Sequence, residues 1–150
     1  MWNPLLSYTN LGVVVVVFPY QAPNGYDPAR SKVSDNAMQN FLNGETSLDL
    51  LTVPGIGPKA AESLAKENIT IVPHLLAKYM SGAVTEEQDT TDGSGVTIDV
   101  FSTNQHFWHF LQSAGVHSLR SGIVNAVNRK VASFDNQFTD NTVYDKEEEE

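Results

Sequence analysis

The chain has 150 residues and no cysteine, a length that suits one domain with a hydrophobic core. The lack of cysteine excludes disulfide scaffolds, thiolate metal sites and cysteine nucleophiles, and it predicts a reducing, intracellular environment. The formal net charge of -9 argues against a nucleic-acid partner unless the acidic residues lie outside the folded domain.

The acidic residues are concentrated in two segments. Residues 34–80 and 101–135 together hold six acidic and six basic residues, so this part of the chain is neutral. Residues 81–100 hold five acidic residues and no basic one, and residues 136–150 hold six acidic residues and one lysine. We therefore expect a neutral domain at 34–135, with an acidic loop insertion at 81–100, followed by an acidic, mobile tail at 136–150.

Residues 1–33 are predicted to form an extended N-terminal arm, because prolines recur through them and no helix can persist. Within this arm, the β-branched stretch Val13–Val17 favours a short strand or an extended segment. The longest apolar run, Leu11–Phe18, has eight residues. A helix of that length cannot cross about 30 Å of hydrocarbon, so no membrane span is expected.

Capping residues and apolar spacing predict the helices that follow. Ser34-Asp35 begins the first helix, and Asn43-Gly44 ends it with residues that tolerate a left-handed conformation. Thr46-Ser47 caps a short helix that ends at Val53, since Pro54 disfavours helix in the residue before it.

The next helix begins at Pro58 and ends near Asn68, and Thr70 caps another helix. Residues 81–100 lack helical periodicity and are predicted to form a loop, in which Val96–Ile98 is a candidate strand.

Two helices are expected in the last third of the domain. Ser102 or Thr103 caps the first, which carries a run of aromatic residues and ends at Gly115. Ser118 caps the second, which continues with apolar residues at helical spacing to Phe134. The predicted fold is all-α: a compact bundle of five or six short helices between an extended arm and an acidic tail.

The turn between the second and third predicted helices has the chemistry of an anion site. Gly55 and Gly57 let the backbone bend sharply and approach a ligand, and Ile56 between them is expected to point into the core. The helix that follows begins with amides that have no intrahelical partner, at the positive end of its dipole. Lys59 adds a positive charge beside this turn. Lys66 contacts the same ligand or balances the dipole at the other end of the helix.

The segment Leu51–Leu64, LTVPGIGPKAAESL, resembles the helix-hairpin-helix motif of DNA repair and recombination proteins. The resemblance implies that the amides of the turn hold the phosphates of one DNA strand without reading bases. The motif also occurs as a packing unit without a ligand, so a purely structural hairpin is the alternative.

A longer stretch, residues 34–135, is similar to the barrier-to-autointegration factor family of small all-helical chromatin proteins. The order of elements matches, from the hairpin through the aromatic helix Phe107–Leu111 to a final helix that contains Arg120 and ends at Phe134. The resemblance implies a nuclear homodimer that binds double-stranded DNA irrespective of sequence. The first helix here lacks the basic residues expected of that family, and residues 81–100 replace a short connection.

Other candidate residues favour simpler interpretations. Arg120, Arg129 and Lys130 form either a second phosphate contact or a solvated helix face. His106 and His109 are one helical turn apart, as metal ligands can be, but the aromatic residues among them favour packing or a surface position. Serine, histidine and aspartate are present, but nothing in the sequence arranges them as a catalytic triad, and there is no paired set of carboxylates; we therefore expect neither an enzyme nor a metal or cofactor.

The sequence thus supports two hypotheses about function. The first is a non-enzymatic, sequence-independent module that binds double-stranded DNA through Gly55, Ile56, Gly57, Lys59 and Lys66. The second is a protein-interaction or structural subunit of a larger complex that retains the hairpin only as an element of its fold.

Overall fold

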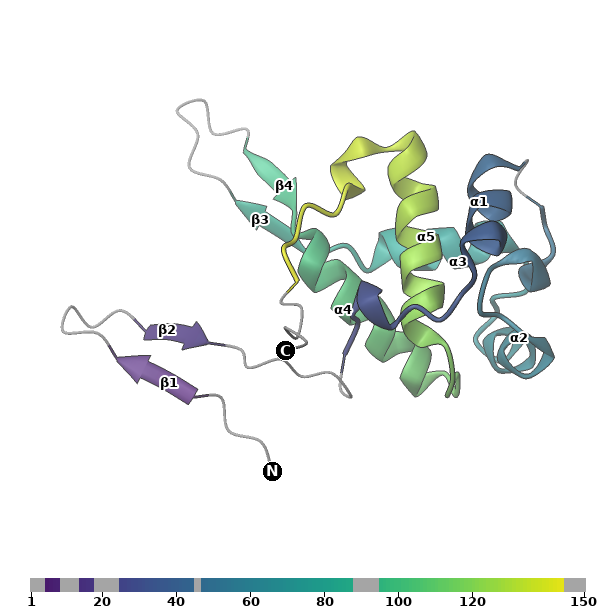
Figure 1. Cartoon of the computed structure of the whole chain (residues 1–150), viewed down its shortest axis with the longest axis horizontal. Coiled ribbons are helices and arrows are strands. Elements are labelled where there is room, and N and C mark those ends of the chain that lie inside the picture. Colours follow the sequence, from purple (N-terminus) through teal and green to yellow (C-terminus); the bar gives the residue numbers. More distant parts are fainter. Residues whose placement is uncertain (1–4, 9–13, 18–24, 45–46, 88–94, 145–150) are drawn as a thin grey trace.

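Helices account for most of the residues that the structure, a computed structural model, describes (Figure 1). These residues are 5–8, 14–17, 25–44, 47–87 and 95–144. Within them lie five α-helices and three 3-10 turns, and none of these helices is long and apolar enough to cross a membrane. The α-helices are α1 (Asp35–Asn43), α2 (Pro58–Ala65), α3 (Val72–Ser81), α4 (Val100–Ser113) and α5 (Arg120–Phe134). The 3-10 turns are Pro28–Arg30, Leu50–Thr52 and Asn136–Phe138.

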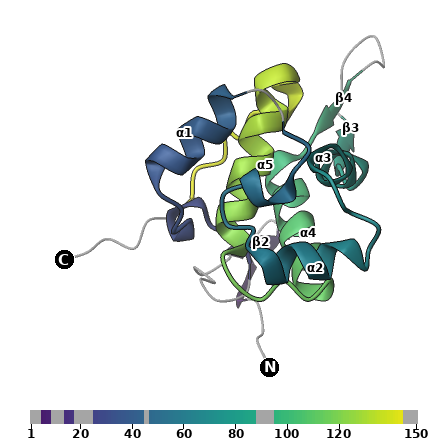
Figure 2. The same ribbon diagram turned by 90° about the vertical axis from the view of Figure 1, so that its right-hand side faces the viewer.

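Helix α5 forms the centre of the core. Its side chains Ile123, Val124, Ala126, Val127 and Val131 have no exposed surface. The helices α1, α3 and α4 pack against it, and Figure 2 shows α5 between α1 and α4. Because α5 buries apolar and polar residues around most of its circumference, it needs neighbours on several sides, as the central helix of a bundle does.

Two short antiparallel hairpins show that the all-α prediction holds only in part. Strand β1 (Leu5–Tyr8) pairs with β2 (Val14–Val17), and β3 (Thr85–Glu87) pairs with β4 (Val96–Ile98). The fold is therefore mainly helical with two small sheets. The strand expected at residues 96–98 is confirmed, and a strand covers most of the valine-rich stretch of the arm.

The segment 81–100 was predicted to be a loop, but long-range hydrogen bonds draw its two ends together. The Asp99 amide donates to the Val84 carbonyl at 2.7 Å, and the Val84 amide donates to Thr103 Oγ1 at 2.9 Å. The start of β3 and the end of β4 are therefore fixed beside α4. Residues 88–94 of the predicted acidic insertion lie outside the described residues.

Helix starts agree with the prediction only in part. Ser34 caps α1, where its Oγ accepts from the Ala37 amide at 3.2 Å. Helix α4 begins earlier than expected, because Asp99 Oδ1 accepts from the Ser102 amide at 3.0 Å. Ser102 and Thr103 therefore lie inside the helix, and the prediction that either caps it was wrong.

Three other predicted caps were also wrong. The short helix expected after Thr46-Ser47 is the 3-10 turn Leu50–Thr52, capped by Asp49 and not by Ser47, and Thr46 lies outside the described residues. Thr70 precedes the extended residue Ile71, which is the N-cap of α3, and contacts His74 at 3.3 Å. Ser118 does not cap α5, because Leu119 takes that place in a left-handed conformation with φ of 58°.

Parts of the predicted arm and tail belong to the packed structure. Tyr26 is 4% exposed, and the Gln105 side chain bonds both its amide and its carbonyl, at 2.8 and 2.7 Å. Phe138 is also 4% exposed, and its carbonyl accepts from Asn128 Nδ2 at 2.9 Å. The chain thus packs against the helices from Tyr26 onward and as far as Tyr144, whose ring contacts that of Tyr26.

Candidate nucleic-acid interface

The hairpin turn is fixed to the core by its apolar residues. Val53 is 1% exposed, Ile56 is 5% exposed, and Pro54 between them is buried as well. The Ile56 amide donates to the Val53 carbonyl at 3.0 Å. The prediction that Ile56 points inward is therefore confirmed. Its N–H is used inside the turn, so Ile56 serves as an anchor and not as a phosphate donor.

Gly55 is required by the fold. Its φ is +94°, in the region that side chains disfavour. An added Cβ would lie 2.9 Å from Ile123 Cγ1 and 3.3 Å from the Leu119 carbonyl oxygen. The turn therefore packs directly against the first residues of α5, and only glycine permits this approach.

Gly57 has no such structural requirement. Its φ is −97° and its ψ is −176°, an extended conformation that any residue adopts. An added Cβ would meet nothing within 4 Å. Gly57 is the exposed N-cap of α2, a position at which serine or aspartate would stabilise a helix better. A glycine here leaves the backbone open to close approach from outside.

The first turn of α2 presents free amides to this opening. Among the described residues, the N–H groups of Gly57, Lys59 and Ala60 have no hydrogen-bond partner, whereas that of Ala61 donates to the Gly57 carbonyl at 3.0 Å. Gly57 and Lys59 are exposed, and Ala60 is half-buried. Pro58 between them has no N–H to lose. Unpaired amides at the positive end of a helix are suited to an anionic oxygen.

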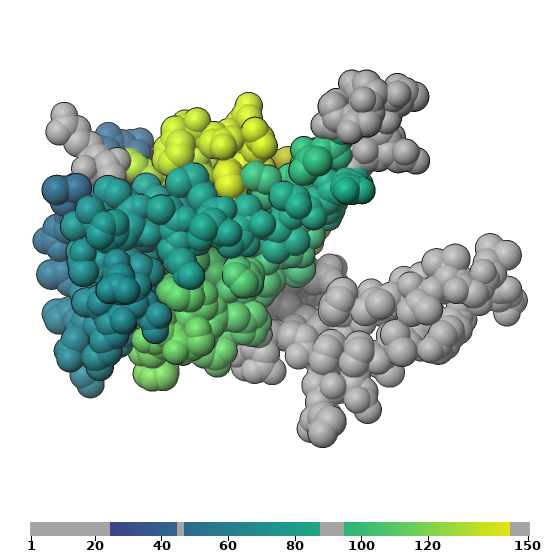
Figure 3. Space-filling model, turned by 180° about the vertical axis from the view of Figure 1, so that it is seen from behind, coloured from purple at the N-terminus to yellow at the C-terminus, as the bar shows by residue number. Residues whose placement is uncertain are grey.

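The two predicted lysine contacts lie at opposite ends of α2. Lys59 is exposed in the first turn, and Lys66 is exposed at the C-terminal cap. A helical rise of about 1.5 Å per residue separates them by roughly 10 Å along the axis. Seen from behind, the segment that contains α2 forms one corner of the molecule (Figure 3). Lys59 is thus beside the free amides, and Lys66 contacts only a ligand that extends along the helix.

Lys130 has a structural role that neither interpretation of the sequence included. It is 7% exposed, and its Nζ donates to the carbonyls of Phe41, Leu42 and Gly44 at 3.1, 3.4 and 3.2 Å. These carbonyls lie at the C-terminal end of α1, where a cation is favoured by the helix dipole. Lys130 is therefore neither a phosphate contact nor part of a solvated face.

Arg120 is also held by the protein. Its guanidinium stacks over the Trp108 ring, 4.3 Å from the centroid, and Nη1 donates to the Val116 carbonyl at 2.9 Å. Of the three basic residues considered together in the sequence, Arg120, Arg129 and Lys130, only Arg129 is exposed. They do not form one phosphate-binding face.

The histidines of α4 lie on its surface. His106 and His109 are both exposed, and His109 contacts the edge of the Trp108 ring. Among the described residues, no group of three or more histidine, aspartate or glutamate side chains is placed to hold a metal ion. Of the two alternatives to a metal site, packing or a surface position, the surface position holds for both histidines.

A buried polar network, not predicted from the sequence, joins α3, α4 and α5. The Tyr79 hydroxyl donates to Asn104 Oδ1 at 2.6 Å and accepts from Asn128 Nδ2 at 2.9 Å. Asn104 Nδ2 donates in turn to Asp140 Oδ2 at 3.3 Å. Burial raises the pKa of Tyr79 above its ordinary value of 10.0, and the bond from Asn128 opposes this shift in part. The network therefore holds a neutral tyrosine in the core.

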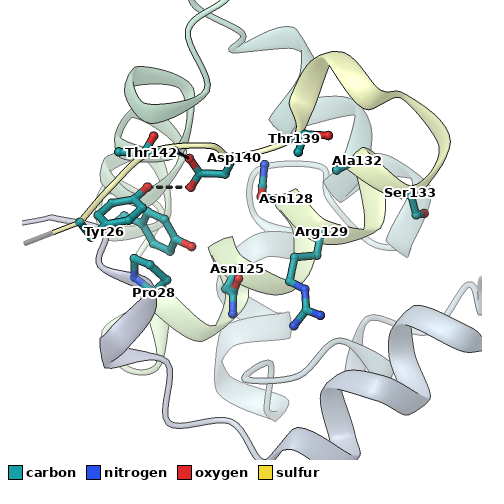
Figure 4. A pocket seen from close by; sticks show the side chains of 11 residues that line it. Tyr26, Pro28, Asn125, Asn128, Arg129, Ala132, Ser133, Thr139, Asp140 and Thr142 are labelled. Atoms are coloured by element: carbon teal, nitrogen blue, oxygen red, sulfur yellow. Dashed lines mark hydrogen bonds between the residues drawn. The ribbon is translucent and has the colours of Figure 1, made fainter. Parts of the chain in front are cut away.

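Beside this network lies an open pocket of about 510 Å³ (Figure 4). Tyr26, Asn125 and Arg129 line it together with Asp140, whose carboxylate accepts from the Tyr144 hydroxyl at 2.7 Å. Burial, followed by the effects of Tyr144 and Asp140, raises the pKa of Tyr26. Residues of the segment 139–144 line one side of the pocket, and no residue of α2 lines it.

Comparison with known proteins gives no significant match: neither a protein-family model, nor a curated protein, nor a solved structure. The helix-hairpin-helix and barrier-to-autointegration factor resemblances accordingly remain interpretations of the sequence. What the structure adds is the geometry of the turn itself.

Proposed function

We propose that the protein is a non-enzymatic module that binds double-stranded DNA irrespective of sequence, through the backbone at the start of α2. The observation that carries this proposal is the pair of exposed residues Gly57 and Lys59, whose amides have no partner among the described residues. Gly57 leaves room for a phosphate, and the Lys59 side chain supplies a charge beside it. Gly55 and Ile56 hold the turn in place.

This geometry accounts for the expected lack of sequence preference. Backbone amides that bind phosphate oxygens fix the position of a protein on DNA but carry no information about bases. The α2 surface offers two lysines, so few phosphates are neutralised. The affinity should therefore be modest and should fall with a shallow slope as salt rises.

Titration of a fluorescently labelled duplex at low and at high salt tests this proposal. We expect binding at low salt that weakens as salt is added, with similar affinities for duplexes of unrelated sequence. A protein that does not bind at low salt, or that prefers one sequence strongly, would contradict it.

A specific observation also favours the alternative of a protein-interaction subunit. Leu48 is 62% exposed and Leu51 is 51% exposed, immediately before the hairpin. Contiguous apolar patches on a surface mark protein contacts, and these two leucines are three residues apart in the chain. If this is their role, Leu51→Glu should disrupt a stoichiometric complex or a homodimer without affecting stability. Size-exclusion chromatography with light scattering measures the difference.

A further inference from the structure

The pocket beside the Tyr79 network is built mainly from polar side chains. All of its lining residues except Pro28 and Ala132 carry a hydroxyl, amide, guanidinium or carboxylate group. Its volume of about 510 Å³ is within the range of about 300–1,000 Å³ that is usual for small-molecule sites. The proposed contact with DNA uses none of these residues, so a ligand of this pocket would be a separate one.

Tyr26 brings an unpaired hydroxyl to the wall of this pocket. The residue is 4% exposed, and Gln105 bonds its backbone amide and carbonyl. The hydroxyl has no hydrogen-bond partner among the described residues, although buried polar groups are normally paired. Burial raises the pKa of Tyr26, so the hydroxyl stays protonated and can donate. This donor is therefore available to a ligand.

Two residues of α5 add further unpaired groups. Asn125 and Arg129 are four residues apart, so their side chains lie on the same face of the helix. Within the described part of the chain, neither side chain has a hydrogen bond or an ion pair. Asn125 is half-buried and Arg129 is exposed. A guanidinium without a partner offers a planar set of donors that matches a carboxylate.

Asp140 brings the opposite charge to the pocket. Its carboxylate accepts from Asn104 Nδ2 at 3.3 Å, from the Thr142 amide at 3.0 Å and from the Tyr144 hydroxyl at 2.7 Å. All three donors are neutral, so these contacts do not balance its charge. A carboxylate has about four lone-pair sites, which leaves one for a cationic group. Figure 4 shows Asp140 and Arg129 on different walls of the pocket.

We propose that this pocket binds a free α-amino acid. The carboxylate of the ligand accepts from Arg129, Asn125 and the Tyr26 hydroxyl, and its ammonium group donates to Asp140. A simple anion would be repelled by Asp140 and a simple cation by Arg129, whereas a zwitterion satisfies both walls. A zwitterion carries no net charge, so the net charge of -9 on the chain does not repel it.

NMR titration of the full-length protein with the standard L-amino acids, one at a time, tests this proposal. We expect at least one of them to shift the amide signals of Asn125, Arg129 and Thr142 progressively until they saturate. The matched ligands for the amino acid that binds are the same molecule without its carboxylate and without its amino group. For glycine these are methylamine and acetate. Each should bind about tenfold more weakly or not at all, because it leaves one wall without its partner.

Arg129→Gln and Tyr26→Phe test the two walls that hold the ligand carboxylate. Both substitutions remove groups that have no partner among the described residues, so the unfolding midpoint should stay nearly unchanged. We expect Arg129→Gln to weaken binding of the amino acid about tenfold and Tyr26→Phe to weaken it several-fold. Lys66→Gln is the control: it removes an exposed charge that does not line the pocket, and it should leave the affinity unchanged.

Three results would overturn the proposal. No amino acid shifts these signals, the amine or the acid alone binds as tightly as the complete amino acid, or the affinity is unchanged in Arg129→Gln. None of these results bears on the proposed function, because the titration contains no DNA and no residue of α2 lines the pocket.

Discussion

Gly55 lies against Ile123, so closely that a Cβ on the glycine would be 2.9 Å from Ile123 Cγ1. This contact joins the hairpin to the start of α5. The fold therefore requires a glycine at position 55 but not at position 57. The distinction is the basis for the first two predictions.

Gly55→Ala should destabilise the protein. The substitution combines a φ of +94° with a contact too short for a methyl group, and we expect a loss of about 1–3 kcal/mol in the free energy of unfolding. Urea denaturation followed by circular dichroism measures the loss. Gly57→Ala is the matched control: its Cβ would meet nothing within 4 Å, so only the poorer N-cap preference of alanine counts, and the loss should be smaller, about 0.5–1 kcal/mol.

Gly57→Asp should separate stability from binding. Aspartate is a good N-cap and its charge suits the positive end of α2, so the free energy of unfolding should stay the same or rise by about 0.5 kcal/mol. The same carboxylate would occupy the amides that we assign to a phosphate. We expect duplex affinity to fall at least tenfold, which is about 1.4 kcal/mol. Unchanged affinity in a stable Gly57→Asp protein would mean that these amides do not bind DNA.

Lys130→Met should weaken the protein without changing its ligand. Methionine keeps most of the apolar stem but leaves the carbonyls of Phe41, Leu42 and Gly44 without their donor. We expect a loss of about 1–3 kcal/mol in the free energy of unfolding. Duplex affinity measured below the unfolding transition should stay unchanged, whereas a direct phosphate contact at Lys130 would make it fall.

The tyrosine pKa values predict a loss of stability in alkali. Burial raises the pKa of Tyr26, Tyr79 and Tyr144 above the ordinary value of 10.0. Above that value the unfolded chain loses tyrosine protons that the folded chain keeps, so stability falls as pH rises. Stability from this source is complete below pH 10. Urea denaturation at about pH 8 and about pH 11 should show the fall, and Tyr79→Phe should reduce it.

The features that the sequence predicted correctly depend on residues close together in the chain. Ser34 caps the helix directly after it, Ile56 points inward because the adjacent glycines bend the chain, and Pro58 begins α2. Each depends on local backbone preferences, which a short stretch of sequence specifies.

The features that it missed depend on partners far along the chain. Lys130 donates hydrogen bonds to carbonyls more than 80 residues away in the sequence. The Gln105 side chain forms a hydrogen bond with the backbone of Tyr26, which is 79 residues away. Leu119 has a left-handed conformation that its own residue type disfavours. Nothing in a local pattern reveals such contacts, so Lys130 could not be told from a surface lysine. The packing of Tyr26 and Phe138 against the helices was missed for the same reason.

The central claim is that the amides at the start of α2 bind phosphate, and NMR titration of the full-length protein with a short duplex tests it most directly. We expect the amide signals of Gly57, Lys59 and Ala60 to shift progressively until they saturate, and Lys59→Glu to weaken the titration. Lys78→Glu, an exposed lysine on α3, should leave it unchanged. If the duplex leaves these three amides unperturbed, or shifts only signals elsewhere, the hairpin is a structural element and the DNA-binding function is contradicted.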